Sequence, residues 1–177
     1  MLEQLRRLLP PPAEPLEAAP PDGWAEVEAA LGTGLPGDFK AFTELYGSGK
    51  VDDFLYLFNP FAEGQDGNLL FEKDRVLAAY AETRASFPER LPLPPFPEPG
   101  GVLPLGRTDN GDELYWVTEG APDDWSVALL ESRAARQEVH PLSATGFLTA
   151  LAAGELRTAI LPDEVVHRPA HQFTPFG

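Results

Sequence analysis

Four residues at 47–50, Gly47-Ser48-Gly49-Lys50, have the types found in a phosphate-binding loop. In such a loop the glycines let backbone N–H groups approach the phosphates, and the lysine reaches the terminal phosphate. The spacing does not fit, because the position of the leading glycine holds Glu44 and the residue after the lysine is Val51. The segment therefore predicts the end of a helix at Gly47 and no phosphate site.

A second segment, residues 109–112, combines two carboxylates with an amide in the order Asp-Asn-Gly-Asp. Hard cations such as Ca²⁺ take several oxygen ligands from one loop. A twelve-residue calcium loop starting at Asp109 would need a glutamate at position 120, which is Gly120. Asn110-Gly111 is instead typical of a tight β-hairpin turn, and we expect a turn without a metal ion.

The remaining reactive side chains do not form a recognisable catalytic or metal-binding pattern. His167 and His171 have a zinc-ligand spacing, but Pro169 disfavours a helix between them and the chain has no cysteine. Ser48 lacks the G-x-S-x-G frame of a nucleophile elbow. The adjacent carboxylates at 52–53 and at 123–124 should diverge rather than converge on a substrate. We therefore predict a protein that is not an enzyme and uses no metal or cofactor.

Acidic residues dominate the chain, which has 177 residues and a formal net charge of −15. This charge argues against nucleic acid as a partner, because nucleic-acid binding neutralises phosphates with Lys and Arg. Two segments, residues 51–72 and 108–131, hold acidic residues and no Lys or Arg. Their acidic residues are Asp52, Asp53, Glu63, Asp66 and Glu72, then Asp109, Asp112, Glu113, Glu119, Asp123, Asp124 and Glu131. Both segments lie mostly in expected turns, where binding surfaces concentrate, so they form either a surface for a basic partner or a solvated acidic face that keeps the protein in solution.

The length suits one domain, and proline-rich stretches mark its organisation. Residues 1–21 are expected to form a short helix with a Leu2, Leu5 and Leu9 stripe, which could dock or fray, and then an extended proline-rich leader. Residues 22–177 are expected to form the domain, with an internal proline-rich loop at 88–104 and an uncertain tail at 156–177. No signal-peptide core or membrane span is apparent, so we expect a cytoplasmic protein.

Helical periodicity predicts three helices in the first half. Trp24, Val27 and Leu31 share one helical face, and Asp22 is placed to cap that helix. A Leu35-Pro36 elbow should start the next helix, which ends at Gly47. A buried strand at 54–58 and a helix at 72–87, ended by Pro88, are expected to follow.

The second half should be a β-meander. Strands are expected at 102–107 and 113–118 around the Asn110-Gly111 turn, and then at 125–129 and 137–140. Ser143 should cap a last helix that Gly154 ends. Because the elements do not alternate as βαβ units, the fold class should be α+β, with a twisted, mostly antiparallel sheet and helices packed on one face and one end.

The order of these features resembles the SUKH superfamily over roughly residues 22–153. The superfamily comprises Smi/Knr-type cell-wall-assembly regulators and immunity proteins of bacterial polymorphic toxin systems. The matching residues are Trp24, Leu31, Gly32, Leu35, Pro36, Phe39, Phe42, Tyr46 and Gly47, then Gly106, Thr108, Asp109, Gly111, Asp112 and Trp116. The resemblance implies a SUKH-like α+β domain.

The resemblance also implies a function, which is protection of the producing cell by direct binding of a cognate toxin domain. Toxins of this kind are often nucleases or deaminases with basic clefts, which an acidic surface would complement. We therefore expect the partner-binding residues to be Asp52, Asp53, Asp109, Asp112, Glu113, Asp123, Asp124 and Trp125. The alternative is a Smi/Knr-type regulatory or scaffold protein that binds a cellular protein through its proline-rich segments.

Overall fold

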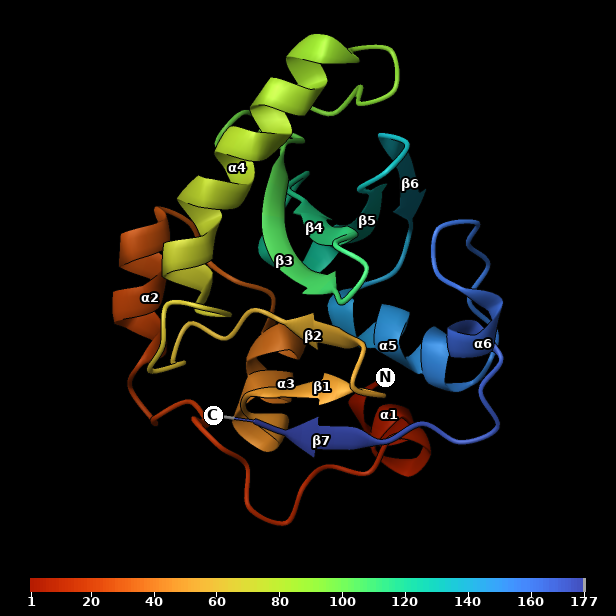
Figure 1. The fold of residues 1–177 in the computed structure, drawn as a ribbon. Helices are drawn as coiled ribbons and strands as arrows, with labels where there is room; N and C mark the ends of the chain where they lie inside the picture. Colours follow the sequence, from red (N-terminus) through yellow and green to blue (C-terminus); the bar gives the residue numbers. More distant parts are fainter. Residues whose placement is uncertain (177) are drawn as a thin grey trace.

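Seven β-strands form one antiparallel sheet, around which six α-helices pack, in residues 1–176, the part of the chain that this computed structural model describes (Figure 1). The strands are β1 (Gly49–Val51), β2 (Leu55–Leu57), β3 (Val102–Thr108), β4 (Glu113–Val117), β5 (Ser126–Glu131), β6 (Arg136–His140) and β7 (Phe173–Pro175). The helices are α1 (Leu2–Leu8), α2 (Trp24–Leu31), α3 (Gly37–Tyr46), α4 (Leu69–Ser86), α5 (Ala144–Ala152) and α6 (Asp163–Val166), with a 3₁₀ turn, η1 (Pro122–Asp124). The α+β class with an antiparallel sheet is thus confirmed.

The strand order is β6-β5-β4-β3-β2-β1-β7, so β2 to β6 follow one another as in the chain. The predicted meander is confirmed, including the turn between β3 and β4, where Gly111 has a φ of +84°. Two short strands, β1 and β7, were not expected. β7 lies in the tail at 156–177 and pairs with β1, so that Val51 stands opposite Phe173. The last residue of this tail, Gly177, is outside the described residues.

Helices cover both faces of the sheet. Successive residues of a strand point to opposite faces, so Tyr115 and Trp116 of β4 lie on different sides. The Trp116 ring packs edge-on against Phe39 of α3, with ring centroids 4.8 Å apart. The Tyr115 ring packs against Tyr80 of α4, at 5.3 Å. The prediction that helices lie on one face and one end is therefore wrong, because Tyr115 and Trp116 are both fully buried and point to opposite faces, so that both faces require cover.

The elbow between α2 and α3 differs in detail from the expected one. Gly23, and not the side chain of Asp22, occupies the N-cap of α2, and α3 begins at Gly37, after Pro36. Glu28 holds the elbow by accepting a hydrogen bond from the Leu35 N–H (2.9 Å) and pairing with Lys40. Burial raises the pKa of Glu28, but these contacts outweigh it and lower the pKa from its ordinary value. The elbow is therefore fixed by a charge as well as by apolar packing.

The N-terminal helix docks on the body of the protein. Leu5 of α1 and Leu9 have no exposed surface. The buried hydroxyl of Tyr46 donates a hydrogen bond to the Leu9 carbonyl oxygen (2.7 Å), and burial raises the pKa of Tyr46 to about 12. Leu5 and Leu9 thus share one core with the rest of the chain. The leader after α1 passes the end of α3, where Leu16 bridges to Gly47.

Candidate functional site

The eight residues predicted to bind a partner do not form one exposed acidic surface. Asp52, Asp112 and Trp125 are buried, with 8%, 4% and 4% of their surface exposed. Asp53 is exposed in the β1–β2 turn, where Asp52 and Asp53 both have positive φ. Each remaining carboxylate has a separate environment.

Asp52 holds the C-terminal segment and is not available to a partner. Its carboxylate accepts hydrogen bonds from Nδ1 of His171 (2.6 Å) and from the Gln172 N–H (3.1 Å). Its own N–H donates to the Gln172 carbonyl oxygen (2.9 Å). An ionised carboxylate is buried only where such partners replace water. The assignment of Asp52 to a binding surface is therefore corrected to that of a structural clamp.

Asp112 also has a structural role, because it joins two hairpin turns. Its carboxylate accepts hydrogen bonds from the Ser132 N–H (3.1 Å) and the Thr108 hydroxyl (3.2 Å). Asp109, at the same turn, is exposed and pairs with Nζ of Lys50 at 2.7 Å. The two aspartates of the Asp-Asn-Gly-Asp segment therefore do not act together, and Asp112 is removed from the candidate surface.

Glu113 is partly buried on the face of the sheet that α4 covers. It accepts a hydrogen bond from the Tyr115 hydroxyl. Burial raises the pKa of Glu113, and this effect exceeds the opposing ones of Tyr115, Arg75 and Arg107. Glu113 thus belongs to a polar region beneath α4 and not to the same surface as Asp123 and Asp124.

Residues 119–125, here called the η1 loop, present the acidic side chains that remain. The loop is fixed at two points. Asp123 accepts a hydrogen bond from the Gly37 N–H at the start of α3 (2.7 Å), and Trp125 packs against Trp116 at 6.1 Å between ring centroids. Asp124, which lies between these two anchors, is exposed, and so is Glu119, which precedes them. The loop therefore presents carboxylates from a backbone that is already ordered.

A hollow of about 300 Å³ adjoins the η1 loop. One wall consists of Asp123, Asp124, Trp125 and Ser126, and the other is the β6–α5 connection, Pro141, Leu142 and Ser143. Ser143 also caps α5, as predicted, by accepting a hydrogen bond from the Gly146 N–H (3.3 Å). The carboxylates of Asp123 and Asp124 beside the apolar side chains of Pro141 and Leu142 suit the charged end and alkyl chain of a lysine or arginine. The sequence does not predict the β6–α5 wall, because no local pattern indicates that this connection lies beside the η1 loop.

The residues that carry the family resemblance form the scaffold of this site. Trp24, Leu35, Phe39, Tyr46 and Trp116 are buried in the core, as is Pro36. A side chain at Gly47 would overlap the Leu16 backbone, and one at Gly106 would overlap the Tyr56 carbonyl oxygen. These buried residues and glycines serve the fold; among the matching residues Asp109 does carry an exposed carboxylate, which pairs with Lys50.

The histidines have different partners. His140 packs against Phe147 at 5.4 Å between ring centroids, His171 contacts Asp52, and His167 is exposed. Burial lowers the pKa of His140, with Glu138 acting in the opposite direction. Within residues 1–176, no three His, Asp or Glu side chains are grouped so that they could hold a metal ion.

Over the same residues, every helix is too short or too polar to cross a membrane. Comparisons with protein-family models, with curated protein sequences and with solved structures gave no match to this chain.

Proposed function

We propose that this protein is a non-enzymatic, cytoplasmic immunity-type protein that binds a cognate bacterial toxin domain and blocks its basic cleft. The main support is the η1 loop, whose adjacent exposed carboxylates, Asp123 and Asp124, line a hollow suited to a cationic side chain; Glu119 is exposed in the same loop. The resemblance of residues 22–153 to the SUKH superfamily supports the same proposal. The binding surface is narrower than the sequence predicts, because Asp52 and Asp112 are buried.

The anchoring of the η1 loop matters for affinity. A loop that orders only on binding loses conformational entropy in the complex, and this loss weakens association. Here Asp123 and Trp125 already fix the loop in the free protein. From Thr108 to Glu131 the chain has no Lys or Arg that would neutralise these carboxylates locally. A partner with a basic cleft is thus steered toward a preformed acidic surface.

The alternative is a Smi/Knr-type regulatory or scaffold protein that binds a cellular partner through its proline-rich leader. One observation favours it: Pro10, Pro20 and Pro21 are exposed, so an aromatic groove could reach them. In this case the leader, and not the η1 loop, would carry the interaction.

Charge reversal separates the two proposals. If a toxin is encoded beside this gene, co-expression should rescue cells from it, and Asp124→Lys should slow association about tenfold at low salt. Glu82→Lys is the matched control, since Glu82 is an exposed carboxylate of α4, remote from the η1 loop in the sequence. Full rescue and an unchanged association rate for Asp124→Lys would refute the η1 surface. Recovery of a non-toxin partner in a pull-down, lost on replacing the leader prolines by alanine, would support the alternative.

A further inference from the structure

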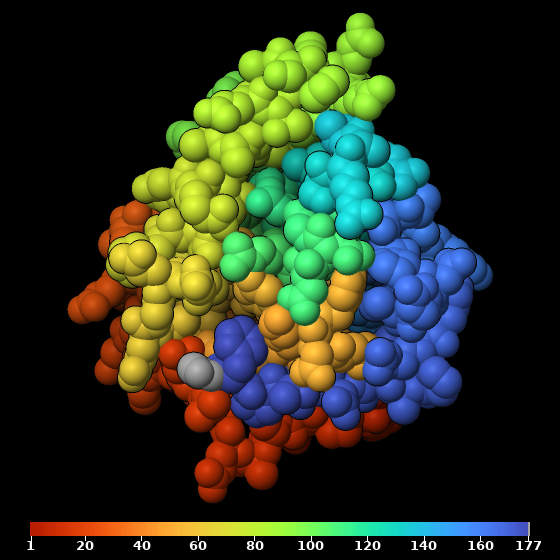
Figure 2. Space-filling model, viewed as in Figure 1, coloured from red at the N-terminus to blue at the C-terminus, as the bar shows by residue number. Residues whose placement is uncertain are grey.

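The C-terminal segment lies on the surface of the protein as a separate arm. Residues 171–176, here called the C-terminal strap, include β7 and follow four exposed residues, 167–170. Figure 2 shows this segment, in dark blue, between the orange β1–β2 region and the red N-terminal residues. β7 stands at the end of the strand order, next to β1. The strap therefore joins the sheet along β1.

Two side chains of the strap are inserted into the body of the protein. The His171 ring is buried, and its Nδ1 contacts the Asp52 carboxylate at 2.6 Å. The Phe173 ring packs edge-on against Phe42 and Tyr46, with ring centroids 6.2 and 5.2 Å apart. Main-chain pairing supplemented by pockets for alternate side chains is the way in which a sheet edge binds a peptide strand. The strap thus has the contacts of a bound ligand, although it belongs to the same chain.

The site that receives the strap, here called the strap site, consists of Phe42, Tyr46, Gly49 and Asp52. Contacts outside the strap hold its aromatic part, because Tyr46 stacks on Phe42 at 4.5 Å between ring centroids and donates a hydrogen bond to the Leu9 carbonyl oxygen. β1 also pairs with β2 on its other side. A side chain at Gly49 would overlap the ring of the strap, so this glycine provides the space for it. The same strap from a second copy would therefore find this aromatic part in place.

The strap and the strap site are complementary in charge. Residues 167–176 contain one arginine and two histidines and no acidic residue, in a chain that has 28 acidic residues. Nδ1 of His171 and Nε of Arg168 both lie near the Asp52 carboxylate, at 2.6 and 3.8 Å. Asp53 adds an exposed carboxylate in the same turn. This complementarity favours the basic strap of a second copy as a ligand for the acidic turn.

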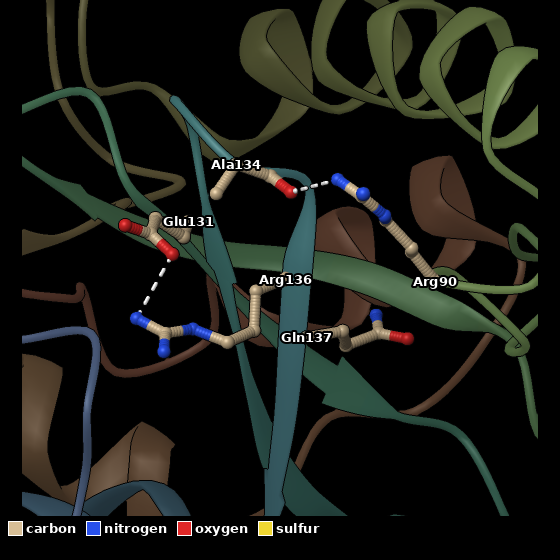
Figure 3. Close-up of a pocket in the computed structure, with 5 residues that line it drawn as sticks. All are labelled: Arg90, Glu131, Ala134, Arg136 and Gln137. Atoms are coloured by element: carbon tan, nitrogen blue, oxygen red, sulfur yellow. Dashed lines mark hydrogen bonds and ion pairs between the residues drawn. The ribbon is translucent and has the colours of Figure 1, made fainter.

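The opposite edge of the sheet does not offer a similar site. Figure 3 shows the residues around a hollow of about 510 Å³ beside β6. Their charged groups already have partners, since Arg136 pairs with Glu131 (3.0 Å) and Arg90 donates a hydrogen bond to the Ala134 carbonyl oxygen (3.0 Å). The acidic acceptor for a basic strand is therefore at β1 and not at this hollow.

Residues 167–170 can act as a hinge for the strap. All four are exposed, and within the described part of the chain residues 168–170 make no backbone–backbone hydrogen bond. Pro169 disfavours a helix here, and four extended residues span at most about 14 Å. Turning the hinge outward breaks few contacts of its own, and a second copy can restore the contacts of the strap. Exchange of an identical element is for this reason a low-cost route to a dimer.

We propose that two copies of this chain exchange their C-terminal straps, so that the strap of each copy pairs with β1 of the other. His171 and Phe173 then fill the same two pockets on the other copy. The dimer is two-fold and closed, because the two exchanges are equivalent. The η1 loop takes no part in it, so this interface is additional to the proposed toxin-binding surface.

Two single-cysteine variants test the exchange, because the chain has no cysteine of its own. Lys50 of β1 and Thr174 of β7 are directly opposite each other, at a spacing that a disulfide can bridge. In a mixture of Lys50→Cys and Thr174→Cys proteins, a disulfide between these two positions can form only between copies. The mixture is oxidised at high protein concentration and about 0.15 M salt, which screens the repulsion between acidic chains.

We expect the yield of this mixed disulfide to exceed that of a control mixture at least about tenfold, because strand pairing gives the two thiols a high effective concentration. The control mixture combines Thr174→Cys with Glu82→Cys, since Glu82 is exposed on α4. Mass spectrometry distinguishes the mixed disulfide from disulfides between copies of one variant. Its yield should rise with protein concentration.

The double variant Lys50→Cys/Thr174→Cys tests both folding and the surface used. Oxidised in dilute solution, it should form the disulfide within one copy, which requires that β1 and β7 pair as in the parent. Locked in this way, the protein should remain monomeric in sedimentation equilibrium. Its reduced form should dimerise as the concentration rises.

Several outcomes would overturn the proposal. Equal yields from the two mixtures would do so, as would equal dimerisation of the locked and reduced forms, because a dimer would then use another surface. A synthetic peptide of residues 167–176, with cysteine in place of Thr174, tests a different occupant. If this peptide cross-links to Lys50→Cys protein and Thr174→Cys protein does not, the strap site binds a free segment and not a second copy. Asp124→Lys should leave the mixed disulfide unchanged, so failure of the exchange and failure of toxin binding are separate results.

Discussion

Replacing Tyr46 with phenylalanine removes one oxygen atom from the centre of the protein. That oxygen belongs to a fully buried side chain and makes one hydrogen bond, to the Leu9 carbonyl (2.7 Å). Leu9 follows α1, so its carbonyl has no partner from a further helical turn. Tyr46→Phe therefore leaves a carbonyl group facing apolar neighbours.

The size of the effect follows from that orphaned acceptor. Leaving a buried hydrogen-bonding group unsatisfied costs about 1–3 kcal/mol in unfolding free energy. Burial of Leu5 and Leu9 contributes roughly 1.5–3 kcal/mol each. The loss is thus smaller than the apolar contribution, so α1 should stay docked while the whole protein becomes less stable by about 1–3 kcal/mol.

Urea denaturation followed by circular dichroism measures this loss. The midpoint should fall with an unchanged m-value, since the folded state stays equally compact. Leu5→Ala is the larger perturbation, expected to lower the unfolding free energy by about 2–5 kcal/mol. Ser86→Ala, which removes an exposed hydroxyl on α4, should change it by less than about 0.5 kcal/mol. A Tyr46→Phe protein as stable as the parent would refute the docking of α1 through this hydrogen bond.

Two further substitutions test the buried carboxylates. Burial raises the pKa of Glu113 in the folded protein above the ordinary carboxyl pKa of 4.5. At a pH above 4.5, ionisation of Glu113 therefore opposes folding. Glu113→Gln removes this ionisation and should raise the unfolding free energy at pH 7 by about 0.5–1 kcal/mol. That gain should vanish in urea titrations at pH 4, and a gain independent of pH would contradict the assigned cause. Asp52→Ala should lower the unfolding free energy by about 3 kcal/mol or more, because it leaves His171 and the Gln172 N–H without their acceptor. Amide hydrogen exchange should then accelerate first in β1 and β7, and uniform acceleration would show that Asp52 is not a local clamp.

Local patterns predict most of the regular elements. The helices at 24–31 and 37–46 and the strands from β3 to β6 follow from apolar spacing and from turn residues, because these signals act over a few residues. α4 begins at Leu69, three residues before the predicted helix at 72–87, since Asn68 caps it by accepting a hydrogen bond from the Leu70 N–H (3.0 Å). β1 and β7 escape prediction because each has only three residues, and β7 pairs only with β1, a strand distant in the sequence.

The candidate site is harder to predict, because it too depends on contacts between residues that are distant in the sequence. Whether a carboxylate is exposed depends on partners that are distant in sequence, and for Asp52 these are 119 and 120 residues away. Asp123 and Asp124 are adjacent and both exposed, yet only Asp123 accepts a hydrogen bond from the distant Gly37 N–H. Charge runs therefore identify the segment that bears the surface, and only the tertiary structure separates its free carboxylates from its structural ones.

The pairing of β1 with β7 also determines the order in which the sheet can assemble. Joining segments about 120 residues apart in an unfolded chain costs roughly 4 kcal/mol of closure entropy, against roughly 1 kcal/mol for a four-residue hairpin. Once β1 to β6 and α5 have formed, only the segment after α5 remains to be closed. We therefore expect β7 to add last and to detach first, so that native-state fluctuations expose the outer edge of β1 before any other part of the sheet.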